Sequence, residues 1–239
     1  MGRPENEVDQ TVPARAALAK FLRERRHAAG LTYRQMSKNR GGRPSAATLE
    51  RAAAGTTVPA WDTIEHFITA TLTENDLFGP EMLLARAHEL WIRARRATRA
   101  PYYVHTAPDP TLIADTADLL RALRHQHVWA GYPSPGEMQA TAGGWALPKS
   151  TTQRIIDGLT LPVDPPQALA FLRACYVQEE TELERWLDAA VRALKNDPPR
   201  RFKDIGTWIR AHRAMVGKTR ETERAPVTPL HDQTGPRAA

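Results

Sequence analysis

The feature that most constrains the fold of this chain is an internal repeat at a spacing of 103 residues. The segment ATLER beginning at Ala47 is followed by GTTVP at Gly55, and STTQR beginning at Ser150 is followed by GLTLP at Gly158. Solenoid repeats have periods of roughly 20–50 residues, so this longer spacing is typical of a duplicated small domain. The sequence therefore predicts two copies of one domain.

The match continues into the flanking segments, with an offset that drifts from 101 to 104 residues. Leu18, Leu22, Arg23, Gly30 and Met36 correspond to Leu119, Leu123, Arg124, Gly131 and Met138, and Phe67, Ile68 and Ala70 correspond to Phe171, Leu172 and Ala174. Surface connections tolerate such single-residue insertions. In a chain of 239 residues, the pattern predicts a first domain at 12–100, a linker at 101–110, a second domain at 111–195 and a C-terminal segment at 196–239.

Apolar residues recur at helical spacing in both copies, and no segment alternates as a half-buried strand would. The first helix is expected to begin after Thr11 as its N-cap and to end at Gly30, and its counterpart is expected over Thr111–Val128. The apolar stripes of the first and fourth helices comprise Ala14, Ala17, Leu18, Phe21, Leu22, Ile64, Phe67, Ile68 and Leu72 in copy one, and Ile113, Thr116, Leu119, Leu120, Leu123, Ala168, Leu169, Leu172 and Cys175 in copy two.

A longer helix with tryptophan closes each copy, over Glu81–Arg99 and Glu179–Leu194, and one further helix is expected over Arg201–Val216. The last twenty residues are polar and contain proline, which predicts disorder. The expected fold class is all-α: two tandem five-helix domains followed by a C-terminal helix and a disordered tail.

Positive charge is concentrated in copy one and near the C-terminal end. Residues 11–60 hold ten basic and two acidic residues, a balance of +8, whereas residues 111–165 hold four and five, a balance of −1. Residues 195–239 hold ten basic and five acidic residues, a balance of +5. A concentrated basic surface favours a polyanionic partner.

The cysteine content and the hydropathy pattern indicate where in the cell the protein is expected. The one cysteine, Cys175, allows no intrachain disulfide or cysteine-built metal site and is expected to be a small buried hydrophobic residue. Neither a signal peptide nor an apolar run long enough to cross a membrane is evident. These properties predict a cytoplasmic, nucleoid-associated protein with no membrane partner.

Two short helices joined by a glycine-containing turn lie between the first and fourth helices of copy one. Residues 30–39 read GLTYRQMSKN, residues 40–44 read RGGRP and residues 45–55 read SAATLERAAAG, with Thr32 and Ser45 placed as N-caps. Here the chain resembles the Cro/repressor-type (Xre-like) helix-turn-helix family of DNA-binding proteins, in its actinobacterial style. The resemblance covers residues 13–72 and, more weakly, 111–176. It implies two tandem helix-turn-helix domains, although the turn from Asn39 to Pro44 is longer than the tight version of the family.

The second short helix of copy one is the expected recognition helix. If Leu49, Ala52 and Ala53 point into the core, the outward face consists of Ala46, Ala47, Glu50, Arg51 and Ala54, and a helix this slim can enter a major groove. Arg51 is expected to contact a base, and the alanines to meet thymine methyl groups. Further DNA contacts are expected from Arg34, Gln35, Lys38, Arg40, Arg43 and Ser45. The alternatives are an Arg51 that faces solvent or pairs within its helix, and ordinary solvated charges at 38, 40 and 43.

Copy two keeps this framework and changes its surface. SPGEM at Ser134 begins its first short helix, Gly143 and Gly144 lie in the turn, and KSTTQR at 149–154 is expected to face outward. The candidate DNA contacts are Lys149, Ser150, Gln153 and Arg154. The alternative is a degenerate repeat retained for packing or dimerisation.

Other motifs do not support an enzyme. VGKT at Val216 lacks the first glycine and the preceding strand of a phosphate-binding loop, and His125 and His127 lie on different sides of a helix, which disfavours a shared metal. No set of residues typical of nucleophilic or acid–base catalysis stands out. We expect no enzymatic activity, no metal and no cofactor.

The sequence therefore predicts a sequence-specific double-stranded DNA-binding protein, most simply a transcriptional regulator with two recognition helices in successive faces of the major groove. An asymmetric or direct-repeat site is expected, and neutralisation of about six phosphates predicts a log–log salt slope of about −5. Two alternatives stay open: a plasmid, phage or chromosome-end maintenance protein that recruits replication machinery, and a helix-turn-helix-derived protein-interaction module. A homodimer, and a transcription or replication protein as partner, also stay open.

Overall fold

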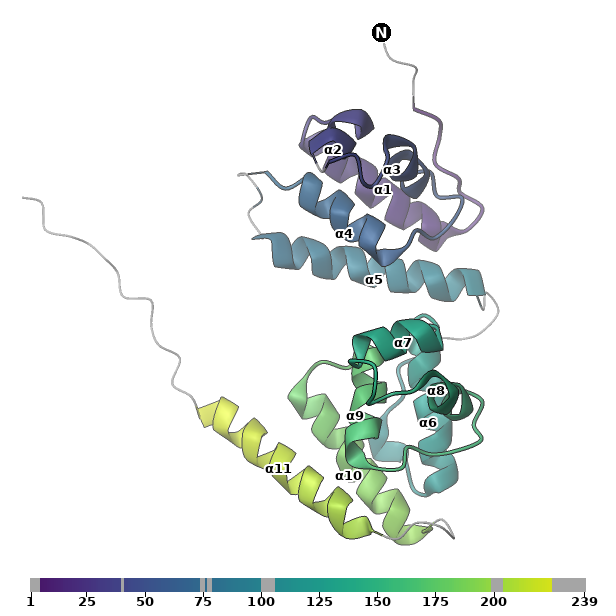
Figure 1. The fold of residues 1–239 in the computed structure, drawn as a ribbon, viewed down its shortest axis with the longest axis vertical. Helices are drawn as coiled ribbons and strands as arrows, with labels where there is room; N and C mark the ends of the chain where they lie inside the picture. The colour runs from purple at the N-terminus through teal and green to yellow at the C-terminus, as the bar shows by residue number, and fades with distance from the viewer. Residues whose placement is uncertain are drawn as a thin grey trace, which may run out of the picture. The chain divides into compact units, whose positions relative to one another are not determined.

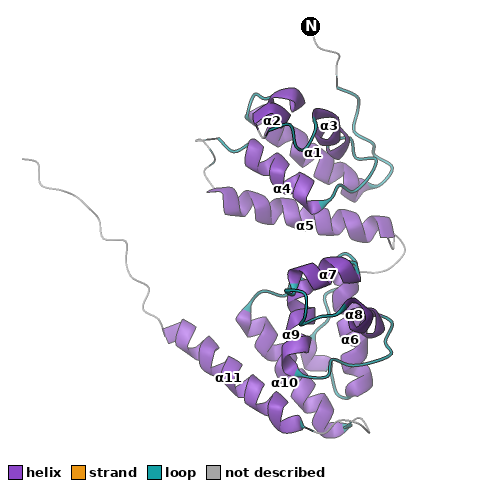
Figure 2. Ribbon diagram, in the orientation of Figure 1, coloured by secondary structure: helices purple, strands orange, loops and turns teal. Residues whose placement is uncertain are grey.

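The structure, a computed structural model, describes residues 5–39, 41–73, 76, 79–99, 106–198 and 204–224, the last seven as backbone only. All regular elements in this part of the chain are helices, which confirms the predicted all-α class (Figure 2). They are α1 (Pro13–Ala28), α2 (Tyr33–Asn39), α3 (Ala46–Ala52), α4 (Trp61–Ala70), α5 (Gly79–Arg99), the 3₁₀ turn η1 (Pro110–Leu112), α6 (Thr116–Trp129), α7 (Pro135–Thr141), α8 (Lys149–Ile156), α9 (Pro165–Ala174), α10 (Glu180–Asn196) and α11 (Ile205–Arg224).

The chain forms two compact units. The first spans 1–108 together with 123–138, and the second spans 109–122 together with 139–239, so α6 and α7 are divided between them. Residues 123–138 join the first unit by packing on α5: the Arg96 guanidinium lies 3.9 Å from the ring centroid of Trp129, and Arg95 donates to Glu137 at 2.9 Å. The units therefore do not follow the boundaries expected from the repeat. A division into duplicated domains at 12–100 and 111–195 stays a prediction.

In the first unit, α1 and α4 pack on α5, while α2 and α3 lie on the side away from α5 (Figure 1). The core residues exposed by at most 1% include Leu18, Leu22, Met36, Leu49, Ile64, Phe67 and Ile68. The predicted stripe of α1 is partly wrong, because Ala17 is exposed whereas Ala16 and Ala19 are buried. The predicted stripe of α4 also extends too far, since Leu72 lies beyond the end of the helix and is exposed.

Two helix starts differ from the prediction, and in both places the predicted threonine cap donates to an aspartate two residues earlier instead of capping a helix. The N-cap of α1 is Val12, and the predicted cap, Thr11, instead donates its backbone N–H and its hydroxyl to Asp9. In the second copy, α6 begins at Thr116 rather than at Thr111. There Asp109 caps the 3₁₀ turn, and Asp115 accepts from the Asp118 N–H at 2.8 Å at the start of the helix.

In the second unit, α10 packs on α11, α9 and η1. The buried side chains include Leu147, Ile155, Phe171, Leu172, Leu183, Trp186, Leu187 and Trp208. Cys175 is also buried, as predicted, and burial raises the pKa of its thiol.

The C-terminal helix is longer than expected. Because α11 continues to Arg224, the first five of the last twenty residues are helical, contrary to the predicted disorder. The later residues, like 201–203 and the linker residues 100–105, lie outside the described part of the chain.

Candidate nucleic-acid interface

α2 is held at its start by a reciprocal pair of hydrogen bonds, the capping box. The Thr32 N–H donates to Gln35 Oε1 at 2.8 Å, and the Gln35 N–H donates to Thr32 Oγ1 at 3.3 Å, which confirms Thr32 as a helix cap. Met36 on the same helix is 1% exposed and anchors α2 to the core. Arg34, Gln35 and Lys38 are exposed on the outer side.

The corresponding helix of copy two, α7, has the same local structure. The Ser134 N–H donates to Glu137 Oε2 at 2.6 Å, the Glu137 N–H donates to Ser134 Oγ at 3.3 Å, and Met138 is fully buried as Met36 is. Glu137 thus combines capping with its ion pair to Arg95. The two predicted helix starts are equivalent at the level of individual hydrogen bonds.

The turn between α2 and α3 contains two glycines with positive φ. The Gly41 N–H donates to the Lys38 carbonyl at 3.1 Å and the Gly42 N–H to the Ser37 carbonyl at 2.9 Å, so these residues close α2. Arg43 follows and is exposed. The other predicted phosphate contact of this turn, Arg40, lies outside the described residues.

α3 has one buried and one exposed side, as the sequence predicts. Leu49, Ala52 and Ala53 are buried, whereas Ala47, Glu50 and Arg51 are exposed and Ala46 and Ala54 are partly exposed. Ser45 caps the helix by accepting from the Thr48 N–H at 3.2 Å. No neighbouring segment covers the outer face of α3 among the described residues, so this face is accessible.

The Arg51 side chain lies along its own helix. Its Nε donates to the Ala47 carbonyl at 3.3 Å and its Nη2 to Thr48 Oγ1 at 3.4 Å. Both contacts are long and exposed to water, so releasing them costs little. The structure therefore shows the intrahelical alternative for Arg51 in a form that leaves the guanidinium able to turn outward.

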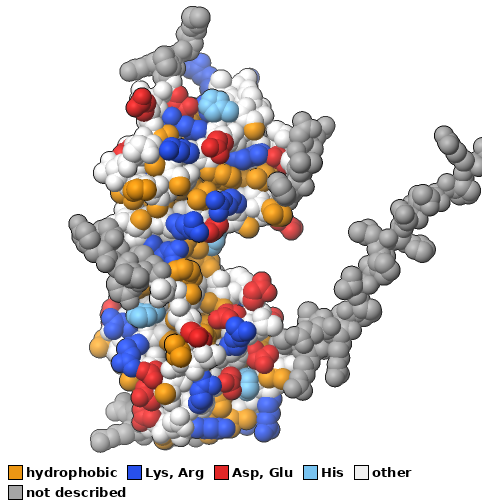
Figure 3. Space-filling view, turned by 180° about the vertical axis from the view of Figure 1, so that it is seen from behind, with side chains coloured by type: hydrophobic (Ala, Val, Ile, Leu, Met, Phe, Trp, Pro, Cys, Tyr) orange, Lys and Arg blue, Asp and Glu red, His pale blue; other side chains and the backbone are white. Residues whose placement is uncertain are grey.

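Ion pairs neutralise part of the basic charge of copy one. On α1, Arg23 and Arg26 pair with Glu5 at 3.2 and 2.7 Å, and Arg25 pairs with Asp76 at 2.7 Å. The Arg25 hydrogen bond, followed by that of the Thr73 backbone, lowers the pKa of the Asp76 carboxyl. On the face shown in Figure 3, basic and acidic side chains accordingly lie side by side over the first unit.

The sequence count of +8 missed this neutralisation because the paired acids lie outside residues 11–60. The basic residues around α2 and α3 differ from Arg23, Arg25 and Arg26 of α1. Among the described residues, Arg34, Lys38, Arg43 and Arg51 have no carboxylate within ion-pair distance. Unpaired positive charge is therefore concentrated beside the exposed face of α3.

α8 in the second unit repeats the two-sided character of α3. The four candidate contacts Lys149, Ser150, Gln153 and Arg154 are exposed, and Gln153 Nε2 donates to Asp157 Oδ1 at 2.8 Å. The expectation that all of 149–154 faces outward is wrong for Thr152, which is fully buried at the position of Leu49. Its hydroxyl donates to the Pro148 carbonyl at 2.9 Å, which satisfies the buried polar group.

An exposed tryptophan in the second unit was missed from the sequence. Trp145 follows Gly143 and Gly144 before α8 and is 85% exposed, and the apolar side chains of Leu159 and Val163 are also exposed. At the offset of the paired glycines, Trp145 corresponds to Arg43 of copy one. Aligning the glycine turns of the two copies would have marked Trp145 as a residue of the interface, but it would not have predicted that the side chain is exposed.

The comparisons identify no relative: no protein-family model matches the chain, and no curated protein or solved structure is significantly similar to it. Among the described residues, no helix is both long and apolar enough to cross a membrane. The same residues contain no group of three or more His, Cys, Asp or Glu side chains arranged to hold a metal ion.

Proposed function

We propose that this protein binds double-stranded DNA sequence-specifically through α3 of the first unit and acts as a transcriptional regulator of the Cro/repressor helix-turn-helix type. The observation that carries the proposal is the outer face of α3. This face is accessible over the whole helix, while Leu49, Ala52 and Ala53 hold its inner side in the core.

The dimensions of α3 suit the proposed role. An α-helix with its side chains is about 10–12 Å across, and a B-DNA major groove is about 12 Å wide. The small side chains of Ala46 and Ala47 allow the start of the helix to come close to base edges and thymine methyl groups. Arg51 is the long donor on this face, and bidentate contact with guanine is its favoured mode.

Phosphate contacts are assigned to the unpaired basic residues beside α3. Arg34 and Lys38 on α2 and Arg43 in the turn flank the exposed face and lack acidic partners among the described residues. Such contacts set the position of the helix without reading sequence. Arg23, Arg25 and Arg26 of α1 are excluded from this role, because Glu5 and Asp76 already pair with them.

The proposal is tested by selecting duplexes from a randomised pool with the full chain. We expect one enriched motif, and fluorescence anisotropy should give at least roughly a thousandfold preference for it over random duplex. The variant Arg34→Gln/Lys38→Gln/Arg43→Gln should weaken binding to both duplexes. The control, Arg86→Gln/Arg93→Gln, removes two exposed charges of α5 and should bind like the wild type. Failure to enrich any motif, or equal weakening by both variants, would refute the assignment.

A contribution of α8 is a separate part of the proposal. Lys149 and Arg154 are exposed and placed as Ala46 and Arg51 are in α3. Removing both charges should shorten the selected motif if α8 reads DNA. An unchanged motif would assign DNA recognition to α3 alone.

A further inference from the structure

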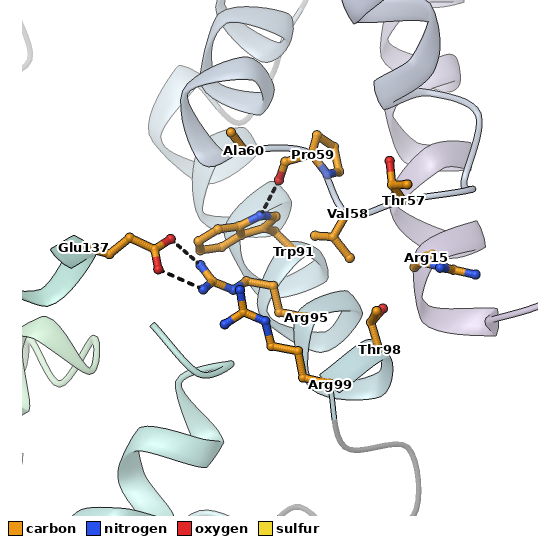
Figure 4. Close-up of a pocket in the computed structure, with 10 residues that line it drawn as sticks. All are labelled: Arg15, Thr57, Val58, Pro59, Ala60, Trp91, Arg95, Thr98, Arg99 and Glu137. Atoms are coloured by element: carbon orange, nitrogen blue, oxygen red, sulfur yellow. Dashed lines mark hydrogen bonds and ion pairs between the residues drawn. The ribbon is translucent and has the colours of Figure 1, made fainter. Parts of the chain in front are cut away.

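A cavity of about 340 Å³ lies in the first unit between the loop after α3 and the second half of α5 (Figure 4). Val58, Pro59 and Ala60 of the loop and Trp91 of α5 form its apolar wall. The Trp91 indole N–H donates to the Pro59 carbonyl at 2.9 Å, which fixes the orientation of the ring. This volume is near the lower end of the range of about 300–1,000 Å³ that is usual for small-molecule sites.

The polar side of the cavity is built on Arg95, which is only 4% exposed. Its guanidinium lies 4.5 Å from the Trp91 ring centroid and donates to the two Glu137 carboxylate oxygens at 2.9 and 3.1 Å. Nη2 also donates to the Tyr132 carbonyl at 3.0 Å. The remaining donor, Nε, is buried and has no hydrogen-bond acceptor in the described part of the chain. Four other guanidinium nitrogens in the described residues share this state, one of them Arg15 Nε at the same cavity. The role given to Arg95 therefore rests on the balance of charge around it.

The side chains that line the cavity carry more positive than negative charge. Arg99 lies beside Arg95 (Figure 4), and the two guanidiniums share one lining carboxylate, that of Glu137. Partial burial lowers the pKa of the Arg99 guanidinium, and the charge of Arg95 lowers it further. Arg15, at the other side of the cavity, has Asp9 at 4.0 Å as its own counterion. The site therefore carries an excess of one positive charge, which a monoanion would neutralise.

We propose that this cavity binds a small monocarboxylate with a flat apolar body, such as an aromatic acid. The ring lies against Val58, Pro59 and Trp91, and the carboxylate accepts hydrogen bonds from Arg99, beside the buried Arg95 guanidinium. The apolar wall favours this class over inorganic phosphate, which would leave the wall in contact with water. The site does not depend on the proposed DNA binding, and it is tested without DNA.

The test is isothermal titration calorimetry of the full chain with three probes that separate charge from shape. Benzoate has both the ring and the carboxylate, benzamide has the ring without the charge, and inorganic phosphate has charge without the ring. We expect benzoate to bind at one site per chain and the other two probes to bind at least roughly tenfold more weakly, since charge-assisted hydrogen bonds and apolar contact are both required.

Two variants locate the site, and a third controls for charge on the same helix. Arg99→Gln should weaken benzoate binding roughly tenfold or more, and Val58→Trp should abolish it by filling the cavity. Arg93→Gln removes an exposed arginine of α5 that pairs with Glu89 outside the cavity, and it should bind benzoate like the wild type. Circular dichroism tests whether each variant is folded. If Val58→Trp does not fold, Arg99→Gln still tests the site, because Arg99 is exposed and its replacement should leave the fold intact.

The proposal is overturned if benzoate does not bind the wild type. It is also overturned if benzamide or phosphate binds as tightly as benzoate, or if folded Arg99→Gln and Val58→Trp both retain full benzoate affinity. Loss of binding in Arg93→Gln would place the anion elsewhere on α5 and would equally reject the cavity.

Discussion

Arg51 is the residue on which the proposed sequence specificity depends most. Among the described residues, its guanidinium makes two contacts, both long and both within its own helix, to Ala47 and Thr48, so it can turn to a base at small cost. Replacing Arg51 with Ala should cost about 1–3 kcal/mol on the selected duplex and much less on a random one, because bidentate base contacts carry sequence information. Anisotropy titrations on both duplexes measure the difference.

Arg34→Ala is the matched control for Arg51. A phosphate contact should be lost equally on the selected and random duplexes and should reduce the salt slope by about 1. If Arg51→Ala gives this same uniform loss, Arg51 contacts phosphate and another residue reads the base.

Glu137 connects acid titration to the stability of the first unit. Partial burial raises its pKa, but hydrogen bonds from Arg95 and from the Ser134 N–H outweigh this and lower the pKa from 4.5 to about 2. Its carboxylate therefore stabilises the fold above about pH 4.5, and this contribution is lost as the pH falls toward about 2. The Glu137 side chain is 47% exposed, so solvent screening limits its ion-pair contribution to about 1 kcal/mol.

Replacing Glu137 with Gln should accordingly lower the melting temperature by about 2–4 °C at pH 7, measured by circular dichroism. The difference from the wild type should shrink steadily below pH 4.5. Glu89→Gln, which removes an exposed acid of α5, should change stability by less than about 0.5 kcal/mol. A difference for Glu137→Gln that stays constant down to pH 2 would show that the charge of Glu137 is not the cause.

At the scale of elements, the end of α3 depends on the close packing of Gly55. Its φ is +81°, and a Cβ added there would lie 3.0 Å from the Asp9 carbonyl oxygen and 3.1 Å from Val8 Cγ1. Gly41 also has a positive φ, +67°, but a Cβ there would meet nothing within 4 Å. A side chain at Gly41 would therefore meet backbone strain alone, whereas one at Gly55 would meet both backbone strain and a steric clash.

Gly41→Ala should cost about 1–2 kcal/mol through φ alone, whereas Gly55→Ala should cost more because the 5–9 segment must also move. Urea unfolding of the two variants measures the difference. Because that movement displaces the C-terminal end of α3, Gly55→Ala should also weaken DNA binding. Equal destabilisation by both changes would mean that the contact with Asp9 does not matter.

Local sequence patterns predicted the elements well and their long-range partners poorly. Spacing and capping chemistry within a few residues predict the short helices and the buried side of α3. They also predict the caps of these helices, Thr32 and Ser45. The helix starts at Thr11 and Thr111 were wrong because each threonine is held by the aspartate two residues before it and does not cap a helix.

Contacts between residues distant in the sequence were not predictable in this way. The pairing of Glu5 with Arg26 and the meeting of Arg95 with Glu137 depend on tertiary packing, which periodicity does not report. The unpaired charge beside α3 and the cavity on α5 both result from such contacts, so they emerged only from the structure.

At the scale of the whole molecule, the number of unpaired cations determines how DNA binding should respond to salt. The interface of α2, α3 and their turn has four described cations without acidic partners: Arg34, Lys38, Arg43 and Arg51. α8 adds Lys149 and Arg154. Each phosphate neutralised contributes about −0.9 to the slope of log K against log salt concentration, so the first set alone predicts a slope of about −3.6 and both sets together about −5.4.

Anisotropy titrations of the selected duplex at several salt concentrations therefore report how many recognition surfaces act on one site. A slope near the larger value that falls by about 2 in Lys149→Gln/Arg154→Gln would show that both units hold the same duplex. A smaller slope, unchanged in that variant, would assign binding to the first unit and leave α8 for another role. A slope near zero would contradict the electrostatic basis of the proposed interface, because counterion release is unavoidable when lysine and arginine neutralise phosphates.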